Sequence, residues 1–430
     1  MDLSLEVNAP TVSDAPQETD WDIRCSYRLQ APSQTLLAKA NRIGGGTLNI
    51  QAQHALIACV HDEICQEYPP RPEYTLRILK RALSLAEMEG QLVADELYEA
   101  HCELMAKPSA SPKLDEIEWD YKTLAYTPLK DTDTQMSLDT PEKLISARQL
   151  SRSEGFPSIT TPPDSNSYNP DPTDSLLITL RLSPNCFAGG TGCHDWDAGV
   201  FLAELVVSYP GLFRGKRVME LGAGSGLAGV CLSRLNQGQQ VILSDGDHDT
   251  LGNLRYNLSV NKVALSPERD CTRSSEATAE AAREGRLWPE DNRVQLLPLV
   301  WEDWSHAQLQ ALGAQVIIGG DIVYDPVLVK PLIHALGGLL TPSDLDEGVE
   351  RELPYAVICT TLRQESTLQL CLDAAREAGL EVVDYTNELF PTNFFHHQNS
   401  LRREDIHVHV FRYDPLSQVN SDDEPEDISS

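Results

Sequence analysis

A chain of 430 residues is long enough for two domains, or for one domain with appendages, and its hydrophobic content of 41% is enough for a buried core. The 65 acidic and 34 basic side chains give a formal net charge of −31, and no run of lysine and arginine forms the basic stripe that grips a phosphate backbone. We therefore expect no direct nucleic-acid partner. The acidic surface suits a basic protein substrate or a cationic cofactor instead.

The N-terminus and the cysteines indicate the cellular compartment. The first twenty residues, MDLSLEVNAPTVSDAPQETD, lack the basic and apolar parts of a signal peptide, and no stretch reaches the about 18 uninterrupted apolar residues of a membrane span. The ten cysteines include no Cys-x-x-Cys pair. Cys186, Cys193 and His194 lie close in sequence, but no second ligand pair follows them at zinc-finger spacing. We expect a soluble protein of a reducing compartment, with free thiols, no metal and no membrane partner.

The first part of the chain predicts a small helical unit. Residues 1–46 are expected to be disordered or extended. From 47 to 107, apolar residues recur at three- and four-residue steps, and prolines, an aspartate and a lysine stand where helix ends prefer them. Residues 108–174 are rich in Pro, Ser, Thr and Asp, which predicts a linker with little to bury.

The remainder, residues 175–415, alternates strand and helix patterns. Apolar strands joined by helices predict a parallel doubly wound sheet. Only loop-like sequence joins the last two strands, so the last one is expected to be antiparallel. Residues 264–290 are expected to form a surface insertion, and 416–430 an acidic disordered tail. The predicted strands are 175–183, 216–221, 240–245, 293–301, 314–324, 355–363, 380–385 and 405–413; the main helices are 195–209, the one after the glycines, 248–261, 326–340 and 366–379.

The stretch VMELGAGSGLAGV, residues 218–230, packs four glycines into eight positions after an apolar strand. It contains a dinucleotide-type G-x-G-x-x-G, but the turn begins earlier, at Gly222, and a phosphate-binding P-loop is excluded because no Gly-Lys-Ser/Thr follows. The pattern E-x-G-x-G-x-G is typical of the S-adenosylmethionine (SAM) loop of seven-strand methyltransferases. Glu220 is placed to receive the methionine amine of SAM. Asp245, at the end of the next strand, is placed to bind the ribose hydroxyls.

Two further segments sharpen this prediction. GGDIVYDP ends the fourth strand with Asp321 and Tyr324 as D-x-x-Y, and side chains at the carboxyl ends of strands face the ligand crevice of an open α/β sheet. LVWEDW puts Trp301 at the end of the third strand, where an indole can cover the adenine of SAM. Trp196, on the helix before the core, is a second candidate wall of the site.

These segments together resemble methyltransferase family 16, the seven-β-strand protein-lysine methyltransferases. The resemblance rests on WDAGVFLAEL, VMELGAGSGLAG, ILSD, LVWEDW and GGDIVYDP. The segments EYPPRPEYTLRILKRAL and ADELYEAHCELMAK are similar to the helical extension of the family members that act on elongation factor 2. The segment ELFPTNFF, before the last strand, also resembles that group. The resemblance covers about half the chain.

The resemblance implies methyl transfer from SAM to a lysine of elongation factor 2, in the cytoplasm, by a protein that we expect to be a monomer. It also implies that the helical unit helps to select that partner; the alternative is that these helices merely cover an apolar face of the core. Four alternatives stay open: methylation of another protein lysine, methylation of a small molecule, an inactive SAM-fold binding module and a dehydrogenase. By position, the catalytic residues are Asp321 and Tyr324, and the cofactor residues are Trp196, Glu220, Gly222, Gly224, Asp245, Trp301 and Gly320, the last standing where relatives usually carry alanine.

Overall fold

The computed structural model describes residues 18–106, 119–128, 139–146, 175–183, 191–235, 239–266, 288, 294–342, 352–397 and 401–415. Four expectations fall wholly or mostly outside these ranges: disorder at residues 1–17, most of the linker, most of the insertion at 264–290 and the acidic tail. Within the described ranges, no helix is both long and apolar enough to cross a membrane.

The helical unit begins earlier than predicted. Residues 20–43, expected to be disordered or extended, form two helices, so that expectation is wrong there. The first helix starts at a capping box in which Thr19 and Asp22 bond reciprocally, and it buries Ile23. The second buries Leu36 and Ala40, one turn apart. The unit comprises α1 (Asp20–Arg28), α2 (Ser33–Ile43), α3 (Ile50–Val60), α4 (Glu63–Glu67), α5 (Pro72–Met88) and α6 (Asp95–Ala106).

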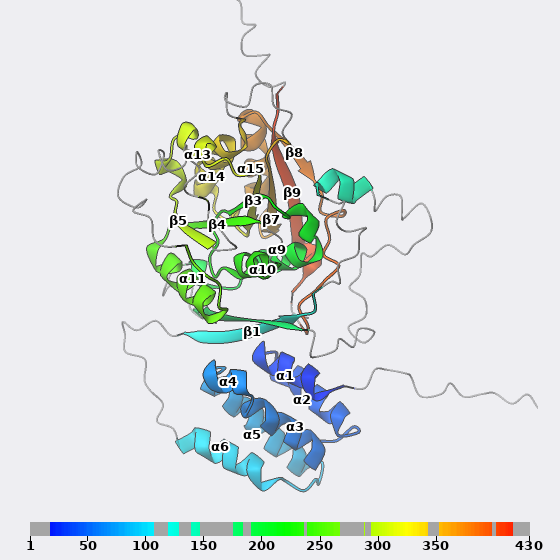
Figure 1. Ribbon diagram of the computed structural model, residues 1–430. Coiled ribbons are helices and arrows are strands. Elements are labelled where there is room, and N and C mark those ends of the chain that lie inside the picture. The colour runs from blue at the N-terminus through cyan, green and yellow to red at the C-terminus, as the bar shows by residue number, and fades with distance from the viewer. Residues whose placement is uncertain are drawn as a thin grey trace, which may run out of the picture.

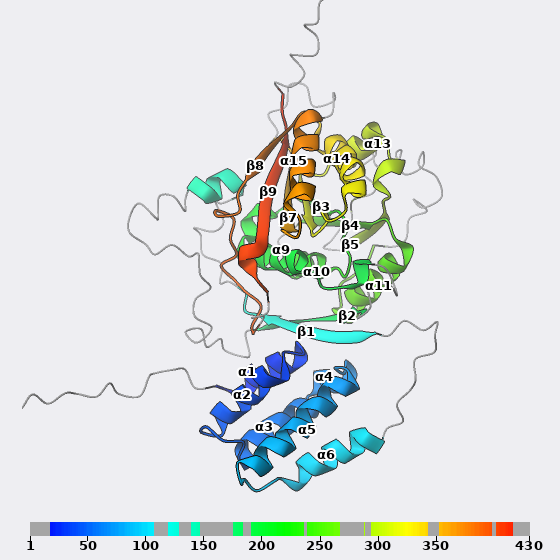
Figure 2. The ribbon, with the colours of Figure 1, turned by 180° about the vertical axis from the view of Figure 1, so that it is seen from behind.

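These six helices enclose a hydrophobic core of their own. Side chains from α1, α2, α3, α5 and α6 form one buried cluster, separate from the clusters around the large sheet. Figures 1 and 2 show the blue helices as a body below the rest of the molecule. The helices therefore bury mostly one another, which disfavours the alternative that they merely cover an apolar face of the core. The division of the chain into domains stays a prediction.

A two-stranded ribbon lies between the helical unit and the rest of the molecule (Figures 1 and 2). Strand β1 (Asp120–Tyr126) pairs antiparallel with β2 (Leu176–Leu182). The prediction of an unstructured linker over 108–174 is therefore wrong at β1, and residues 141–146 are helical as well. The sequence DYKTLAY has aromatic or β-branched residues at Tyr121, Thr123 and Tyr126, but its partner lies about 50 residues further along the chain.

Helix α11 (His248–Val260) and the residue after it satisfy the free edge of β2 with asparagine side chains. Asn257 Oδ1 accepts a hydrogen bond from the Arg181 N–H at 2.7 Å, and Asn261 Oδ1 accepts one from the Thr179 N–H at 3.0 Å. The Asn257 amide also donates to the Ser225 carbonyl at 2.9 Å, in the glycine loop. Asn257 and Asn261 are four helical residues apart, a rise of about 6 Å, and Thr179 and Arg181 are two strand residues apart, a rise of about 6.8 Å. The spacing of the asparagines therefore matches the spacing of the N–H groups that they bond.

A seven-stranded sheet carries the rest of the described chain. Its order is β5-β4-β3-β6-β7-β9-β8, all parallel except β9, which runs antiparallel to both neighbours. The predicted doubly wound sheet with an antiparallel last strand is confirmed. The strands are β3 (Arg217–Glu220), β4 (Gln240–Asp245), β5 (Val294–Pro298), β6 (Val316–Gly320), β7 (Tyr355–Thr361), β8 (Leu380–Asp384) and β9 (Ile406–Tyr413).

Alternation along the strands divides the core between the two faces of this sheet. On β3, Val218 packs with α9 (Asp197–Ser208), α10 (Leu227–Leu235) and α11, whereas Met219 packs with the helices of the opposite face. Those are α13 (His306–Leu312), α14 (Pro326–Leu340) and α15 (Glu365–Glu377). Because helices cover both faces of the sheet, most residues of the parallel strands are apolar. Of these helices, α13 was not predicted.

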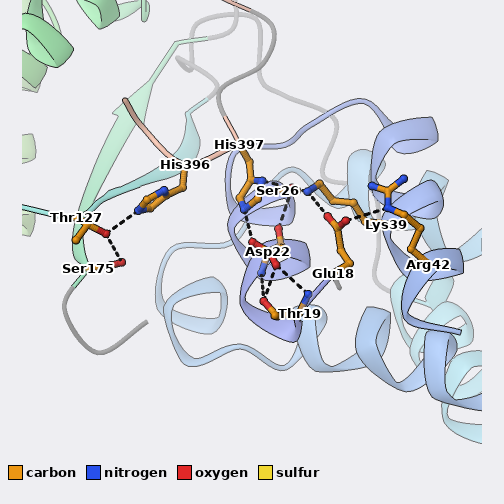
Figure 3. A network of polar contacts seen from close by, with 10 residues as sticks. All are labelled: Glu18, Thr19, Asp22, Ser26, Lys39, Arg42, Thr127, Ser175, His396 and His397. Carbon is orange, nitrogen blue, oxygen red and sulfur yellow. Dashed lines mark hydrogen bonds and ion pairs between the residues drawn. The ribbon is translucent and has the colours of Figure 1, made fainter. Parts of the chain in front are cut away.

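The helical unit also contacts the segment before β9, as Figure 3 shows. The imidazole of His397 lies 2.9 Å from the Asp22 carboxylate and 3.0 Å from the Lys39 ammonium, and Lys39 and Arg42 both bond Glu18. Burial raises the pKa of Asp22, but hydrogen bonds from His397 and Thr19 outweigh it and hold that pKa below its usual range. A charged network therefore joins α1 and α2 to the loop that precedes the last strand.

Acidification is expected to destabilise the fold because His396, the residue before His397, takes up a proton more readily in the unfolded chain than in the folded one. Its ring bonds the Thr127 hydroxyl at 3.0 Å, and burial, followed by the charge of His397, lowers the pKa of His396 to about 4. Between pH 6.5 and 4 the unfolded chain binds more protons at this residue than the folded one. The contribution of His396 to the free energy of unfolding is therefore fully present above pH 6.5 and is lost as the pH falls. At pH 5 the free energy of unfolding is lower by roughly 2 kcal/mol.

The measurement is the change in the free energy of unfolding between pH 7.5 and 5 for the wild type and for His396→Gln. The glutamine variant should lose less stability on acidification than the wild type. His61→Gln, at an exposed histidine after α3, is the matched control and should behave as wild type. Equal losses in the wild type and His396→Gln would contradict the prediction.

Candidate active site

A cavity of about 690 Å³ opens at the carboxyl ends of β3, β4 and β6. This is where the strand order reverses, because the chain passes from β3 to β4 and β5 on one side and resumes with β6 on the other. Its volume lies within the usual range for ligand sites. All nine sequence-predicted site residues line it: Trp196, Glu220, Gly222, Gly224, Asp245, Trp301, Gly320, Asp321 and Tyr324.

The glycine loop needs glycine at positions that other residues do not tolerate. Gly222 and Gly224 have φ values of 58° and 54°, in the left-handed region. A Cβ on Gly224 would lie 2.9 Å from the carbonyl oxygen of Gly192, so a second loop lies directly against this one. Gly320 has a different reason: a Cβ there would lie 2.7 Å from Gly199 Cα, at the start of α9. The close approach of α9 therefore requires glycine at Gly320.

Glu220 carries a buried carboxylate oxygen without a hydrogen-bond partner. The residue is 4% exposed at the end of β3, and its Oε2 bonds no group among the described residues. Burial, followed by the negative charge of Asp245, raises the pKa of Glu220 to about 8. A cationic group in the cavity would remove this penalty by pairing with the carboxylate. The orphaned oxygen therefore fits the ammonium group of SAM.

Asp245 holds the glycine loop as well as facing the cavity. Its Oδ2 accepts from the Gly224 N–H and its Oδ1 from the Asp247 N–H, both at 3.1 Å. Burial raises the pKa of Asp245. A carboxylate keeps further lone pairs beyond these two bonds, which suits the hydroxyls of a ribose. The accepting oxygens of Asp245 therefore fit the ribose of SAM.

Two tryptophans form walls of the cavity. Trp301 lies in the short helical turn η4 (Trp301–Asp303), which follows β5, and is partly buried against the core. Trp196 stands directly before α9, where its indole N–H donates to the Thr191 carbonyl at 2.8 Å. His194 packs edge-on against the Trp196 ring, with the ring centroids 4.7 Å apart. Both indoles are placed to flank a flat ligand group.

Asp321 is bonded by a residue that sequence reasoning missed. Arg363 donates from Nη1 and Nη2 to the two carboxylate oxygens of Asp321, at 2.9 and 2.6 Å. The backbone of Asp321 is in the left-handed region, with φ of 59°. Tyr324 is 46% exposed at the mouth of the cavity. Arg363 follows the carboxyl end of β7, so the same strand-end reasoning that found Asp321 could have found it.

No group of three or more His, Cys, Asp or Glu side chains in the described part of the chain is arranged to hold a metal ion. The described cysteines are free: Cys25, Cys59, Cys65, Cys102, Cys193, Cys231, Cys359 and Cys371. The described residues that line the cavity thus offer carboxylates, the Arg363 guanidinium, the Tyr324 phenol, the His194 imidazole, hydroxyl groups and two indoles.

The sheet order, its antiparallel seventh strand and the glycine loop define the class I SAM-dependent methyltransferase fold, as predicted. The family model described as lysine methyltransferase matches residues 178–273 and confirms for this segment the recognition of methyltransferase family 16. Among solved structures, the chain is similar to a precorrin-6y C5,15-methyltransferase from Geobacter metallireducens: TM-score 0.28, 14% identity, covering 50% of this chain and 86% of that one.

Curated relatives carry lysine methyltransferase names. The chain is 31% identical over 208 residues to "Protein-lysine N-methyltransferase EEF2KMT" of Bos taurus, covering 47% of this chain and 57% of that protein. It is 29% identical over 218 residues to the Homo sapiens protein of the same name, covering 50% and 60%. It is 38% identical over 71 residues to "Calmodulin-lysine N-methyltransferase" of Arabidopsis thaliana, covering 16% and 23%. The chain thus spans less than two thirds of each of these relatives.

Proposed function

We propose that this protein is a SAM-dependent lysine methyltransferase that acts on elongation factor 2 in the cytoplasm, as a monomer. The observation that carries the proposal is the unpaired carboxylate oxygen Oε2 of Glu220, a residue that lines the same cavity as Asp321 and Tyr324. The names of the bovine and human relatives support elongation factor 2 as the target. The net charge of −31 suits a basic protein surface around the target lysine.

The residues around the glycine loop are proposed to hold SAM. Glu220 pairs with its ammonium group, Asp245 accepts hydrogen bonds from the ribose hydroxyls, and Trp301 and Trp196 flank the adenosyl part. Gly222 and Gly224 leave room for close approach along the loop. When bound, SAM supplies a methyl group on a sulfonium, which an amine can take by in-line displacement. The protein mainly has to align the donor and the acceptor.

Asp321 and Tyr324 are proposed to be the catalytic residues, and they form the side of the cavity where the acceptor lysine enters. A lysine amine attacks only when neutral, and with a pKa of about 10.4 roughly one in a thousand is neutral near pH 7.4. That handicap is on the order of 4 kcal/mol. Removal from water lowers the amine pKa. Tyr324, at the cavity mouth, can orient the amine by a hydrogen bond.

The experiment that tests this function measures methyl transfer from tritiated SAM to purified elongation factor 2, followed by mass spectrometry of the labelled protein. The expected result is label on one lysine, with a clearly lower initial rate in the Asp245→Ala variant at a SAM concentration near the wild-type Kd. Label on another protein of a cytosolic extract, but not on elongation factor 2, would contradict the proposed target and identify that protein as the substrate. Tight SAM binding with no transfer to any protein would indicate a binding module, and a change in nicotinamide absorbance would indicate a dehydrogenase.

Replacing Asp321 by alanine is expected to lower the rate of methyl transfer at least about a hundredfold while leaving SAM affinity within about threefold of wild type. The change leaves the Arg363 guanidinium unpaired beside the acceptor, where it opposes the positive charge that develops on the amine nitrogen as the N–C bond forms, and it removes a group that orients the site. Initial rates and calorimetry of SAM binding separate the two effects. Asp325→Asn, at the start of α14, is the control. A near wild-type rate in Asp321→Ala would make the D-x-x-Y motif structural.

A further inference from the structure

The ion pair between Asp321 and Arg363 uses the whole accepting capacity of the Asp321 carboxylate. Besides the two guanidinium N–H groups, the Thr361 N–H lies 3.3 Å from Oδ1 and the Thr361 hydroxyl 3.2 Å from Oδ2. The carboxylate offers about four lone-pair sites, and four donors point at it. Its side chain is 1% exposed. While Arg363 stays in place, Asp321 has no site for a substrate ammonium or for its proton.

Arg363 also touches the wall proposed to flank SAM. Its guanidinium carbon lies 5.1 Å from the centroid of the Trp196 ring, within the range of a cation–π contact. The Arg363 side chain is 43% exposed and lines the same cavity as Asp321. One residue thus connects the acceptor side of the cavity to the cofactor side.

We propose that Arg363 is a positioning residue that neutralises Asp321, so that the cavity takes the acceptor lysine as a neutral amine. The inference rests on the function proposed above. A buried carboxylate without its partner would stabilise an ammonium, and an ammonium has no lone pair for attack. With the pair intact, the amine nitrogen forms the new N–C bond as the C–S bond breaks. The electron pair of that bond stays on sulfur, and the methylated ammonium releases its proton to solvent.

Other charged and titratable groups surround the pair and enter any pH dependence. Asp197 interacts electrostatically with both members of the pair, and burial, then Asp321 and Asp195, raise the pKa of Asp197. All of these groups are present in wild type and in both Arg363 variants below, and only the control variant removes one of them, Arg402, so a comparison of the Arg363 profiles with wild type cancels their contribution. They are Asp195 and Asp197 at the start of α9, Tyr324 after β6, Cys359 on β7, Arg402 before β9 and His194 beside Trp196.

The test compares pH profiles of kcat and KM for wild type and Arg363→Gln, with elongation factor 2 as substrate. The glutamine variant should shift the rising limb of kcat upward by about one pH unit or more, because the unpaired carboxylate raises the amine pKa. At pH 7.5 its kcat should fall about tenfold while KM does not rise. Arg363→Lys keeps the charge and should restore part of the profile. Arg402→Gln, at an exposed neighbour, should match wild type.

The outcomes separate the two proposals. If wild type methylates no protein of a cytosolic extract, both fail. If wild type methylates elongation factor 2 but Arg363→Gln keeps the wild-type profile with equal or higher kcat, only the positioning role fails. An equal loss at every pH in the Gln and Lys variants also overturns it, because that pattern indicates a structural role. If thermal unfolding shows that Arg363→Gln does not fold, Arg363→Met, which also removes the charge, decides: an upward shift of the kcat profile supports the role, and an unshifted profile overturns it.

Discussion

Asp245→Ala is expected to weaken SAM binding at least tenfold while the protein stays folded. The substitution removes the proposed hydrogen bonds to the ribose, and charge-assisted bonds contribute about 1.5–3 kcal/mol each, against about 1.4 kcal/mol for a factor of ten. It also removes the acceptor at 3.1 Å from the Gly224 N–H, so the glycine loop loses a support. Calorimetric titration with SAM measures the affinity, and thermal unfolding checks the fold.

Asp249→Ala is the matched control for this prediction. Asp249 is an exposed acidic residue in the first turn of α11, four positions beyond Asp245, and its removal changes the net charge equally. Its SAM affinity should stay within about twofold of wild type. An Asp245→Ala protein that folds and binds SAM as tightly as Asp249→Ala would refute the ribose assignment.

Glu204→Ala is expected to lower the free energy of unfolding by about 3–5 kcal/mol, because it leaves a buried charge unpaired. Glu204 is fully buried on α9, and its carboxylate accepts from the Arg403 Nε at 2.7 Å and from the Phe395 N–H at 3.0 Å. The Arg403 side chain is 9% exposed and lies over the Phe394 ring. The pair ties the segment before β9 to α9. Thermal or urea unfolding of the full chain measures the loss.

A double substitution tests the cause of that loss. The double variant Glu204→Met with Arg403→Met removes both charges. It should lower the free energy of unfolding by clearly less than the summed losses of the single variants Glu204→Met and Arg403→Met. Asp373→Asn, which breaks an exposed pair with Arg376 on α15, should change the free energy of unfolding by less than about 0.5 kcal/mol. Additive losses in the double variant would show that lost packing, not the unpaired charge, sets the effect.

The large sheet and most of the cavity could be predicted because each depends on short-range pattern. Buried parallel strands are mostly apolar, and the residues at or directly after their carboxyl ends, Glu220, Asp245 and Asp321, meet at one edge of the sheet whatever the loops do. The glycines likewise report local backbone geometry, as Gly224 shows. Fold and site therefore follow from the order of the strands and the residues that end them.

Features that depend on distant partners could not be predicted. Strand β1 exists because it pairs with β2, and the intervening residues give no sign of that pairing. The pair between Asp321 and Arg363 depends on β7 lying beside β6, which the chain order alone does not state. The capping box at Thr19 was readable in principle, but the acidic, proline-containing residues before it favoured disorder.

An asparagine side chain of α11 connects the two-stranded ribbon to the glycine loop by hydrogen bonds. Asn257 is fully buried, and its one amide group bonds the Arg181 backbone of the ribbon on one side and the Ser225 carbonyl of the glycine loop on the other. The ribbon in turn meets α1 of the helical unit through β1, where Gln30 donates to the Tyr121 carbonyl at 3.1 Å. One continuous series of hydrogen bonds therefore joins the helical unit, the ribbon and the glycine loop.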